Sequence, residues 1–405
     1  MLTSVVCLAL LSSCGGGSDS SADSISEAAR KKTPPGQATP VTVTPVPAPA
    51  PAPAPTPITD PIIATSLSGL TAIASNFDVT RALTTSWETG PGNTVGAFRM
   101  TCTAGHLNYD DAIVYPGQPG KAHLHQYFGN TIADANSTYE SLRAAGDSTC
   151  NFTGEGIAAN RSAYWMPAML DGKGNVVRPD YASVYYKERP KSDPIVSDPN
   201  HPQFYGQAVA LPNGLRFIMG WNMIDPSKTI VSTYDFKCDS GASAGKTFPD
   251  MAQALADCPV GGTLFATVRA PDCWDGKNLD SPDHRSHLSY PYNTNLGYFK
   301  CPATHPYVIP AYQLTAAWTV DENKATWTLS SDGMNPGGAR GSTFHADFME
   351  AWDPIIKKVW KDNCIDRLLD CTGGALGDGR MLKGATGAPW KASPRLVPVP
   401  ARPTV

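Results

Sequence analysis

Short apolar runs separated by turn residues dominate the pattern of hydrophobic and polar positions beyond about residue 96. Runs of this length that contain β-branched and aromatic residues and end at Gly, Pro, Asn or Asp are typical of strands. The pattern predicts strands at residues 96–103, 123–128, 163–169, 182–186, 215–221, 263–269, 316–320 and 325–329. The last two flank a polar stretch, 321–324, and predict a hairpin.

Helical periodicity is weak by comparison. Residues 133–145 contain helix formers with little apolar face, and residues 354–369 begin with a proline suited to a first helical turn. Residues 248–256 form a third, shorter candidate. We therefore predict a mainly β protein: a single β-sandwich or jelly-roll-like domain with long disulfide-pinned loops and a few peripheral helices.

Composition changes sharply on either side of this predicted domain. Residues 15–60 are rich first in Ser and Gly and then in Pro and Ala, which predicts a disordered segment followed by a polyproline II stalk. We assign residues 61–390 to the folded β-rich domain and residues 391–405 to a Pro-rich tail.

The N-terminal segment resembles an export signal. Residues 2–11 form an apolar run that is too short to span a bilayer. The following Leu-Ser-Ser-Cys pattern resembles a bacterial lipobox and predicts that residues 1–14 are a lipoprotein signal peptide with Cys14 as the lipidated residue. We expect an exported protein that is lipid-anchored to the bacterial cell envelope, at the outer membrane or the cell surface. An ordinary signal peptide, or a start further upstream, is the alternative, because no basic segment precedes the apolar run.

Cysteine usage agrees with export. Apart from Cys7 and Cys14, eight cysteines remain, and an even number in an exported protein predicts four disulfides. Spacing alone leaves 105 connectivities. Pairing of neighbours would join Cys238 to Cys258, Cys273 to Cys301 and Cys364 to Cys371, each contributing on the order of 3 kcal/mol. The absence of a Cys-x-x-Cys pair disfavours a zinc–cysteine site.

The net charge limits the classes of binding partner that we expect. The formal net charge is −4 and no basic cluster is present, so we expect no nucleic-acid partner. We expect a monomer that meets a polysaccharide or cell-wall glycan and contacts the membrane through its lipid anchor.

Residues 272–290 are the most polar stretch of the predicted domain. Within it, His284 and His287 lie three residues apart, which places them on one face of a helical turn, and Asp283 can orient an imidazole. Asp275 and Asn278 are typical of turns, although such groups also bind sugar hydroxyls.

Two further clusters have the period of a strand. His123 and His125 would share one face of a strand, as would His345 and Asp347. This arrangement supplies two metal ligands, or an acid and a base, side by side. The alternative is a set of partly buried histidines bonded to the backbone.

Five segments together resemble a known family. They are His-Leu-His-Gln-Tyr-Phe-Gly-Asn at 123–130, Ser-Ala-Tyr-Trp-Met-Pro at 162–167, Cys-Trp-Asp-Gly-Lys-Asn-Leu-Asp-Ser-Pro-Asp-His-Arg-Ser-His at 273–287, Cys-Pro-Ala-Thr-His-Pro at 301–306 and His-Ala-Asp-Phe at 345–348. The chain resembles, over about residues 98–371, the secreted family of unknown function numbered nineteen-ninety-six, best known from fungi. Relatives usually have Gly-Asp-Tyr after the last histidine, whereas Ala346-Asp347-Phe348 keeps the carboxylate and lacks the phenol. Some relatives carry modules that bind cell-wall sugars, so the resemblance implies a glycan context but no established activity.

These observations support three hypotheses about function. The leading one is a polysaccharide hydrolase or lyase, because histidine exchanges protons near neutral pH. Its acid, base or metal-ligand groups would be His123, His125, His284, His287 and His345, oriented by Asp283 or Asp347, and its substrate-binding residues would be Gln126, Asn130, Tyr164, Asp275 and Asn278. The second is a non-catalytic glycan-binding lipoprotein. The third is a metal-binding protein in which His123, His125, His287 and His345 hold a divalent metal.

Overall fold

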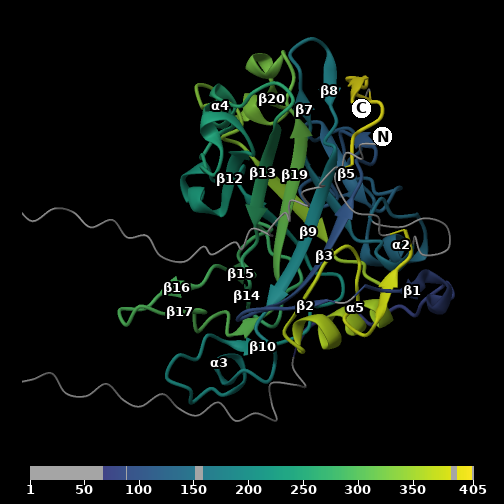
Figure 1. Ribbon diagram of the computed structural model, residues 1–405, viewed down its shortest axis with the longest axis vertical. Helices are drawn as coiled ribbons and strands as arrows, with labels where there is room; N and C mark the ends of the chain where they lie inside the picture. The colour runs from purple at the N-terminus through teal and green to yellow at the C-terminus, as the bar shows by residue number, and fades with distance from the viewer. Residues whose placement is uncertain (1–66, 88, 151–157, 385–389, 404–405) are drawn as a thin grey trace, which may run out of the picture. The chain divides into compact units, whose positions relative to one another are not determined.

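The computed structural model describes residues 67–87, 89–150, 158–384 and 390–403 (Figure 1). The predicted signal peptide, with Cys14, and the predicted stalk lie outside the described residues. In the described part of the chain, no helix is both long and apolar enough to cross a membrane.

The largest sheet has seven strands, most of them antiparallel to their neighbours, in the order β12-β13-β19-β9-β3-β22-β2. Its strands are β2 (Gly90–Pro91), β3 (Gly96–Cys102), β9 (Tyr181–Glu188), β12 (Tyr234–Cys238), β13 (Thr263–Arg269), β19 (Ala311–Thr319) and β22 (Leu369–Cys371). Burial alternates strictly along β9, because only one face of this sheet packs into the protein.

The second sheet has five antiparallel strands in the order β11-β21-β6-β5-β4. They are β4 (Leu107–Asn108), β5 (His125–Gly129), β6 (Ala163–Pro167), β11 (Arg216–Gly220) and β21 (His345–Met349). Every residue of β5, β6 and β21 is buried, so this sheet is covered on both faces.

The two sheets pack face to face through aromatic rings. Phe348 of β21 and Tyr164 of β6 stack on Tyr312 of β19, with ring centroids 4.9 and 5.8 Å apart, and Phe217 of β11 meets the same ring edge-on. The fold is therefore mainly β and sandwich-like, as the apolar pattern predicts. Because side chains alternate along a strand, His125, His345 and other residues between these core positions point to the opposite face of the five-stranded sheet.

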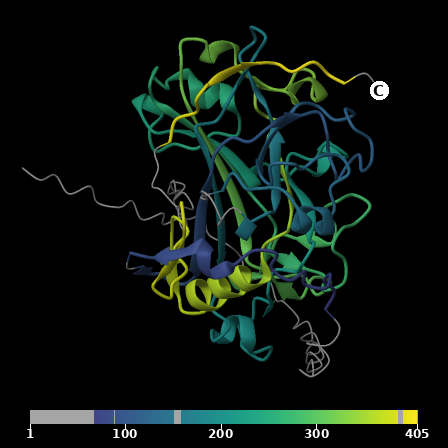
Figure 2. The same ribbon diagram turned by 90° about the vertical axis from the view of Figure 1, so that its right-hand side faces the viewer.

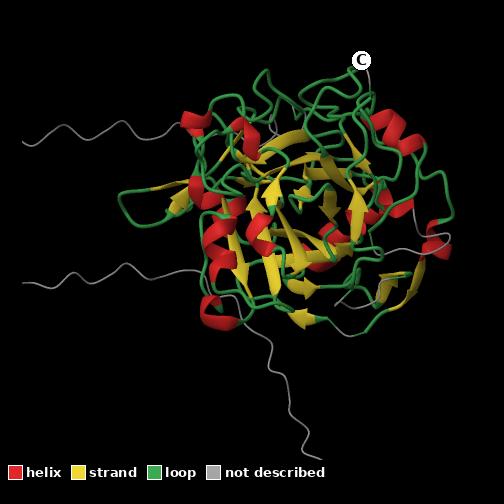
Figure 3. Ribbon diagram, turned by 90° about the horizontal axis from the view of Figure 1, so that it is seen from above, coloured by secondary structure: helices red, strands yellow, loops and turns green. Residues whose placement is uncertain are grey.

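Small sheets and helices surround this sandwich (Figure 3). The small-sheet strands are β1 (Leu83–Thr85), β7 (Met169–Leu170), β8 (Asn175–Val177), β10 (Gln207–Ala208), β14 (Cys273–Trp274), β15 (Leu288–Ser289), β16 (Tyr292–Asn293), β17 (Phe299–Lys300), β18 (Tyr307–Val308), β20 (Thr328–Leu329), β23 (Arg380–Leu382) and β24 (Leu396–Pro398). The helices are α2 (Tyr139–Ala144), α3 (Pro194–Ser197), α4 (Met251–Ala256) and α5 (Pro354–Trp360), which continues as a π-helical turn, Lys361–Ile365. The 3₁₀ turns are Val79–Ala82, Pro226–Lys228, Val231–Thr233, Gly241–Ser243, Lys324–Thr326 and Asp332–Met334.

The helix predictions find the right places with bounds that are too long. The helix predicted at 354–369 begins at Pro354 as expected, and the carboxylate of Asp353 caps it by accepting hydrogen bonds from the N–H groups of Ile355 and Ile356. The candidates at 133–145 and 248–256 shorten to α2 and α4, each of which begins after a capping side chain, Thr138 and Asp250.

The predicted hairpin between 316–320 and 325–329 is wrong. Strand β19 pairs with β13 on one side and β9 on the other, so no free edge remains for a following strand. Residues after the turn instead form a 3₁₀ turn and β20, which pairs with β7 in a different sheet.

The C-terminal segment crosses one end of the sandwich, at the top of Figure 2. Its strand β24 pairs with β8 in antiparallel register. Beyond β24, the Pro400 carbonyl accepts a hydrogen bond from the Tyr109 hydroxyl at 3.0 Å, and the Arg402 guanidinium donates to the Gly120 carbonyl at 2.9 Å. Residues 396–402 therefore hydrogen-bond to the loop between β4 and β5 near both of its ends.

All three disulfides predicted from neighbour pairing are present, namely Cys238–Cys258, Cys273–Cys301 and Cys364–Cys371. Cys102–Cys150 completes the set of four. Disulfides persist in oxidising compartments, so they indicate an extracellular or exported protein.

Candidate metal centre

Three histidines converge at one end of the five-stranded sheet. His125 begins β5 and lies opposite Pro167, the last residue of β6. On the other side of β6, Asp347 lies opposite Trp165, and continuing this register by two residues places His345 level with Pro167. The two histidines therefore flank the same proline, and His123 approaches from the segment just before β5.

The ring nitrogens of these histidines face one another. The His123 Nε2 atom is 3.1 Å from the His125 Nε2 atom and 3.2 Å from the His345 Nε2 atom. His125 and His345 are fully buried, whereas His123 is partly exposed. His123 is therefore the member of the group nearest to solvent.

The other ring nitrogens fix the tautomers. The His125 Nδ1 atom lies 2.9 Å from the Asp110 carbonyl oxygen, and the His345 Nδ1 atom lies 2.8 Å from the Thr343 carbonyl oxygen. A carbonyl oxygen only accepts hydrogen bonds, so both Nδ1 atoms carry the proton in these contacts.

The third ring has the same tautomer. The Ser330 hydroxyl donates to the Leu124 carbonyl at 2.5 Å, so its oxygen accepts from the His123 Nδ1 atom at 3.0 Å. We therefore assign all three rings as Nδ1-protonated, which leaves the three Nε2 lone pairs free, with the His123 Nε2 atom close to the other two.

The surroundings favour neutral rings. Burial, reinforced by the adjacent His345, lowers the pKa of His125 to about 3. Burial also lowers the pKa of His123 and that of His345 well below the ordinary value, with repulsion from the neighbouring ring as the second cause. Neutral imidazoles are the form that binds metal ions.

The spacing suits a small metal ion. In a tetrahedral site with Zn–N bonds of about 2.0–2.1 Å, two nitrogen ligands lie about 3.3 Å apart. The two Nε2 separations of 3.1 and 3.2 Å are close to that value. Hydrogen bonds from Nδ1 to fixed acceptors are the usual support of histidine ligands. His123, His125 and His345 can thus hold a metal with little rearrangement.

Two buried carboxylates adjoin the three histidines. Asp347 lies two residues beyond His345 on the same face of β21, and Asp111 follows β4. Donor atoms of Asp111, Asp347 and His125 all lie within 4.8 Å of one another. Burial and the neighbouring Asp111 raise the pKa of Asp347 well above its ordinary value, and burial raises the pKa of Asp111 to about 6.

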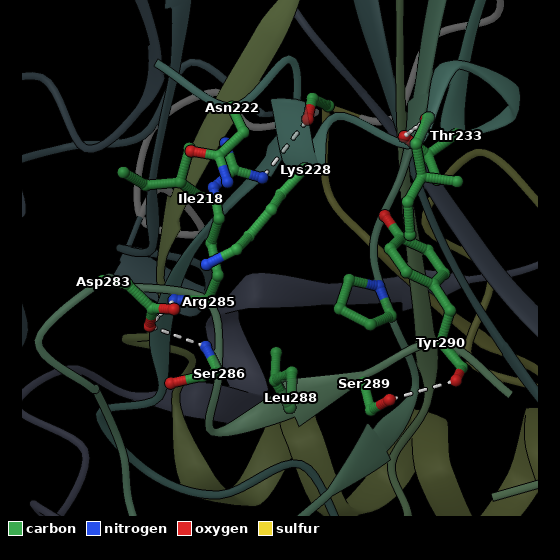
Figure 4. Close-up of a pocket in the computed structure, with 13 residues that line it drawn as sticks. Ile218, Asn222, Lys228, Thr233, Asp283, Arg285, Ser286, Leu288, Ser289 and Tyr290 are labelled. Atoms are coloured by element: carbon green, nitrogen blue, oxygen red, sulfur yellow. Dashed lines mark hydrogen bonds between the residues drawn. The ribbon is translucent and has the colours of Figure 1, made fainter. Parts of the chain in front are cut away.

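A pocket of about 220 Å³ lies at the end of β11, beside the strand that carries His345 (Figure 4). Lys228, Arg285 and Asp283 lie together on one side of it, and Tyr290 lies on the other. The Arg285 guanidinium donates to the carbonyl oxygens of Gly220 and Trp221, at 3.2 and 2.7 Å. The pocket thus brings charged and polar groups to the edge of the sheet that bears the histidines.

The Asp283–His287 segment has a different role from the one predicted. His287 has both ring nitrogens engaged, Nε2 with the Arg216 carbonyl at 3.0 Å and Nδ1 with the Ser281 hydroxyl at 2.9 Å. It therefore offers no nitrogen to a metal, and its assignment as a ligand is corrected. The Asp283 carboxylate accepts from Ser281, Arg285 and Ser286 and closes a turn.

His284 also stays outside the three-histidine group. Its Nδ1 atom is 2.9 Å from an Asp280 carboxylate oxygen, and its backbone adopts a left-handed conformation with φ of 55°. Of the five histidines expected to share one site, the structure brings three together.

The proposed sugar-binding residues divide into two groups. Gln126, Asn130 and Tyr164 are at most 1% exposed and hydrogen-bond to protein groups, so they cannot contact a glycan, and that assignment is corrected. Asp275 accepts hydrogen bonds from the backbone N–H groups of Lys277 and Asn278, which makes it a turn former.

Two residues of the site were missed from the sequence. Asp111 sits beside a second aspartate and before the apolar residues 112–114, an unusual place for a carboxylate and the one available signal. Ser330, which orients His123, lies in an unremarkable Ser-Ser pair and gives no signal.

Comparison with known proteins adds a family and no activity. Neither the curated proteins nor the solved structures contain a match to the chain. A family model described as "Domain of unknown function (DUF1996)" matches residues 111–352, a span that starts at Asp111 and contains all three converging histidines. Because the match covers more than half of the 405 residues, the chain belongs to the DUF1996 family.

Proposed function

We propose that this protein binds a first-row transition-metal ion through His123, His125 and His345. The observation that supports the proposal is the proximity of three unprotonated Nε2 atoms, with each Nδ1 atom held by an acceptor. The neutral His123 Nε2 lone pair lies about 3 Å from each of the other two and is repelled by both, and a metal ion bound by all three nitrogens would relieve that repulsion. Imidazole ligands suit zinc and copper best.

Three protein ligands would leave the fourth coordination position of a tetrahedral metal ion to water or a substrate. Three histidines plus a water molecule form the ligand set of some hydrolytic zinc sites, where the metal lowers the pKa of the bound water. The partly exposed His123 marks the side from which water or a substrate would enter. The Trp221 ring, 6.2 Å from that of His345, limits access on another side.

Metal analysis tests this proposal. The untagged full-length protein, purified without chelators, should contain about one equivalent of zinc or copper. His125→Ala and His345→Ala should lose it, whereas His201→Ala, which changes a histidine outside the site, should keep it. Absence of metal from every preparation, together with no binding on titration with zinc or copper, would overturn the proposal.

A second candidate function is a metal-dependent polysaccharide hydrolase or lyase that uses the same centre. It is supported by the pocket at the end of β11, which lies beside the strand that carries His345 and has polar lining residues, among them Lys228. A screen of cell-wall polysaccharides tests it: cleavage should stop on chelation and in His345→Ala. Glycan binding without turnover would instead favour a non-catalytic glycan-binding protein.

We also propose that the chain is lipidated at Cys14 and carried on the stalk of residues 15–60. The lipobox pattern before Cys14 supports this, and the four disulfides agree with export. Labelled palmitate should enter the protein and should fail to enter Cys14→Ala. Equal labelling of both would refute lipidation at this residue.

A further inference from the structure

Asp347 is a buried carboxylate that the surrounding protein does not stabilise. It is 0% exposed, neither carboxylate oxygen accepts a hydrogen bond, and no ion pair joins it to another residue in the described part of the chain. Leaving an isolated charge in such a place costs several kcal/mol. The positive charge of Arg285 lowers the pKa of Asp347, but the Arg285 guanidinium donates its hydrogen bonds to the carbonyl oxygens of Gly220 and Trp221. A buried, unpartnered carboxylate of this kind marks a binding position.

A second carboxylate is held in place beside it. One oxygen of Asp111 accepts hydrogen bonds from the backbone N–H groups of Ile113 and Val114, both at 2.8 Å. These bonds fix the orientation of the Asp111 side chain. The carboxylates of Asp111 and Asp347 come from opposite sides of β6, whose Trp165 lies directly opposite Asp347 in the sheet. Their donor atoms and one from His125 all lie within 4.8 Å of one another.

This group is distinct from the three-histidine centre. The two groups share His125 and no other residue. Their donors also differ in kind: three nitrogens on one side, and chiefly carboxylate oxygens on the other. Oxygen donors favour hard cations such as Mg²⁺, Mn²⁺ and Ca²⁺. Bond lengths of about 2.0–2.6 Å place two oxygens on one such ion up to about 4–5 Å apart, so donor atoms within 4.8 Å of one another can reach a single ion.

We propose that Asp111 and Asp347, beside His125, bind a second, hard divalent cation next to the three-histidine centre. The protein would then hold two unlike ions, one on the three histidine nitrogens and one on the two carboxylates. His125 would lie between them without binding the second ion, because its Nε2 atom serves the first centre and its Nδ1 atom donates to the Asp110 carbonyl. The inference extends the proposed function, but the second ion has its own ligands and can be tested separately.

Titration of the metal-free full-length protein separates the two sites. With Zn²⁺ and Mn²⁺ supplied together, the wild-type protein should bind two ions, and Mn²⁺ should still bind, by electron paramagnetic resonance, after the three-histidine centre is filled with Zn²⁺. Asp347→Asn and Asp111→Asn should each weaken Mn²⁺ binding more than about a hundredfold, since each removes a ligand charge, and should retain one Zn²⁺. Glu322→Gln, which neutralises an exposed carboxylate, serves as the control.

The outcomes distinguish the two proposals. One Zn²⁺ per protein, lost in His345→Ala and unchanged in Asp347→Asn, with no Mn²⁺ bound, would overturn the second cation and leave the proposed function standing. In that case the two carboxylates would share a proton instead. No ion of either kind would overturn both proposals. Should Asp347→Asn fail to fold, Mn²⁺ binding to the zinc-loaded wild-type protein decides the question.

Discussion

Ser330→Ala is the sharpest perturbation of the proposed metal centre. Two of the three histidine rings are held by backbone carbonyls, which no side-chain substitution removes. The ring of His123 is held by the Ser330 hydroxyl at 3.0 Å. Ser330 is therefore the side chain through which the orientation of one ligand can be changed without altering the ligand itself.

The expected loss of zinc affinity in Ser330→Ala lies at the low end of the range for residues that hydrogen-bond to a metal ligand. Removal of such a partner weakens metal binding by about 10–100-fold. In Ser330→Ala the His123 Nδ1 atom can still donate to the Leu124 carbonyl at 3.3 Å, a longer and weaker bond. We therefore expect a loss of about tenfold in zinc affinity, which corresponds to about 1.4 kcal/mol.

Competition with a chelator of known affinity measures this change. Ser330→Thr keeps a hydroxyl and should recover most of the affinity, and Ser197→Ala, which removes an exposed hydroxyl from α3, should leave it unchanged. Melting curves without metal should agree among the variants to within about 1 kcal/mol. An affinity within twofold of wild type, or a Ser330→Thr variant as weak as Ser330→Ala, would refute the assigned role.

Three further predictions concern the scaffold. Replacing Cys238 and Cys258 with alanine should lower the free energy of unfolding by about 3 kcal/mol, because the disulfide closes a loop of 20 residues; an unchanged urea midpoint would contradict this. Phe348→Ala should cost about 3–5 kcal/mol by leaving a cavity between the sheets, and a loss below 1 kcal/mol would show that the sheets do not pack through this ring. Burial raises the pKa of Asp272 from 3.8 to about 6, so the folded protein holds this proton more tightly than the unfolded chain does. The stability that this proton contributes is complete below pH 3.8 and is lost as the pH rises through about 6. Asp272→Asn should flatten this part of the plot of unfolding free energy, measured with urea, against pH. Parallel plots for the two proteins would disprove the assignment.

Local patterning was enough to predict several strands of the two large sheets, but not β12 or β21. The strand predicted at residues 263–269 forms β13 with the same bounds, because a short run rich in apolar and β-branched residues is typical of a strand. The hairpin after β19 failed for a non-local reason. Turn-like residues follow that strand, but both of its edges are already occupied by β13 and β9, which come from distant parts of the sequence.

The same limit applies to the site. The period-two spacing of His123 and His125, and of His345 and Asp347, showed which side chains share a face. Which clusters meet depends on strand order, because β6 separates β5 from β21 in the sheet. His287 illustrates the opposite error: its sequence neighbours suggest a ligand, whereas Ser281 and the Arg216 carbonyl already engage both nitrogens.

The contacts that residues 396–402 make with the loop between β4 and β5 have a consequence for when the proposed metal ion could bind. His123 and His345 are separated by 222 residues, and the loop that carries Asp111 is fastened by Pro400 and Arg402. While a ribosome or export channel still holds the last residues of the chain, Pro400 and Arg402 cannot make these contacts. The loop that carries Asp111 is then not yet fixed in place. Contacts between such distant residues are slow to form, because the entropy cost of loop closure comes before the contacts contribute. In an exported protein, the metal would be captured from the compartment where folding finishes, and the ions available there, rather than those at the site of synthesis, would decide which one is bound.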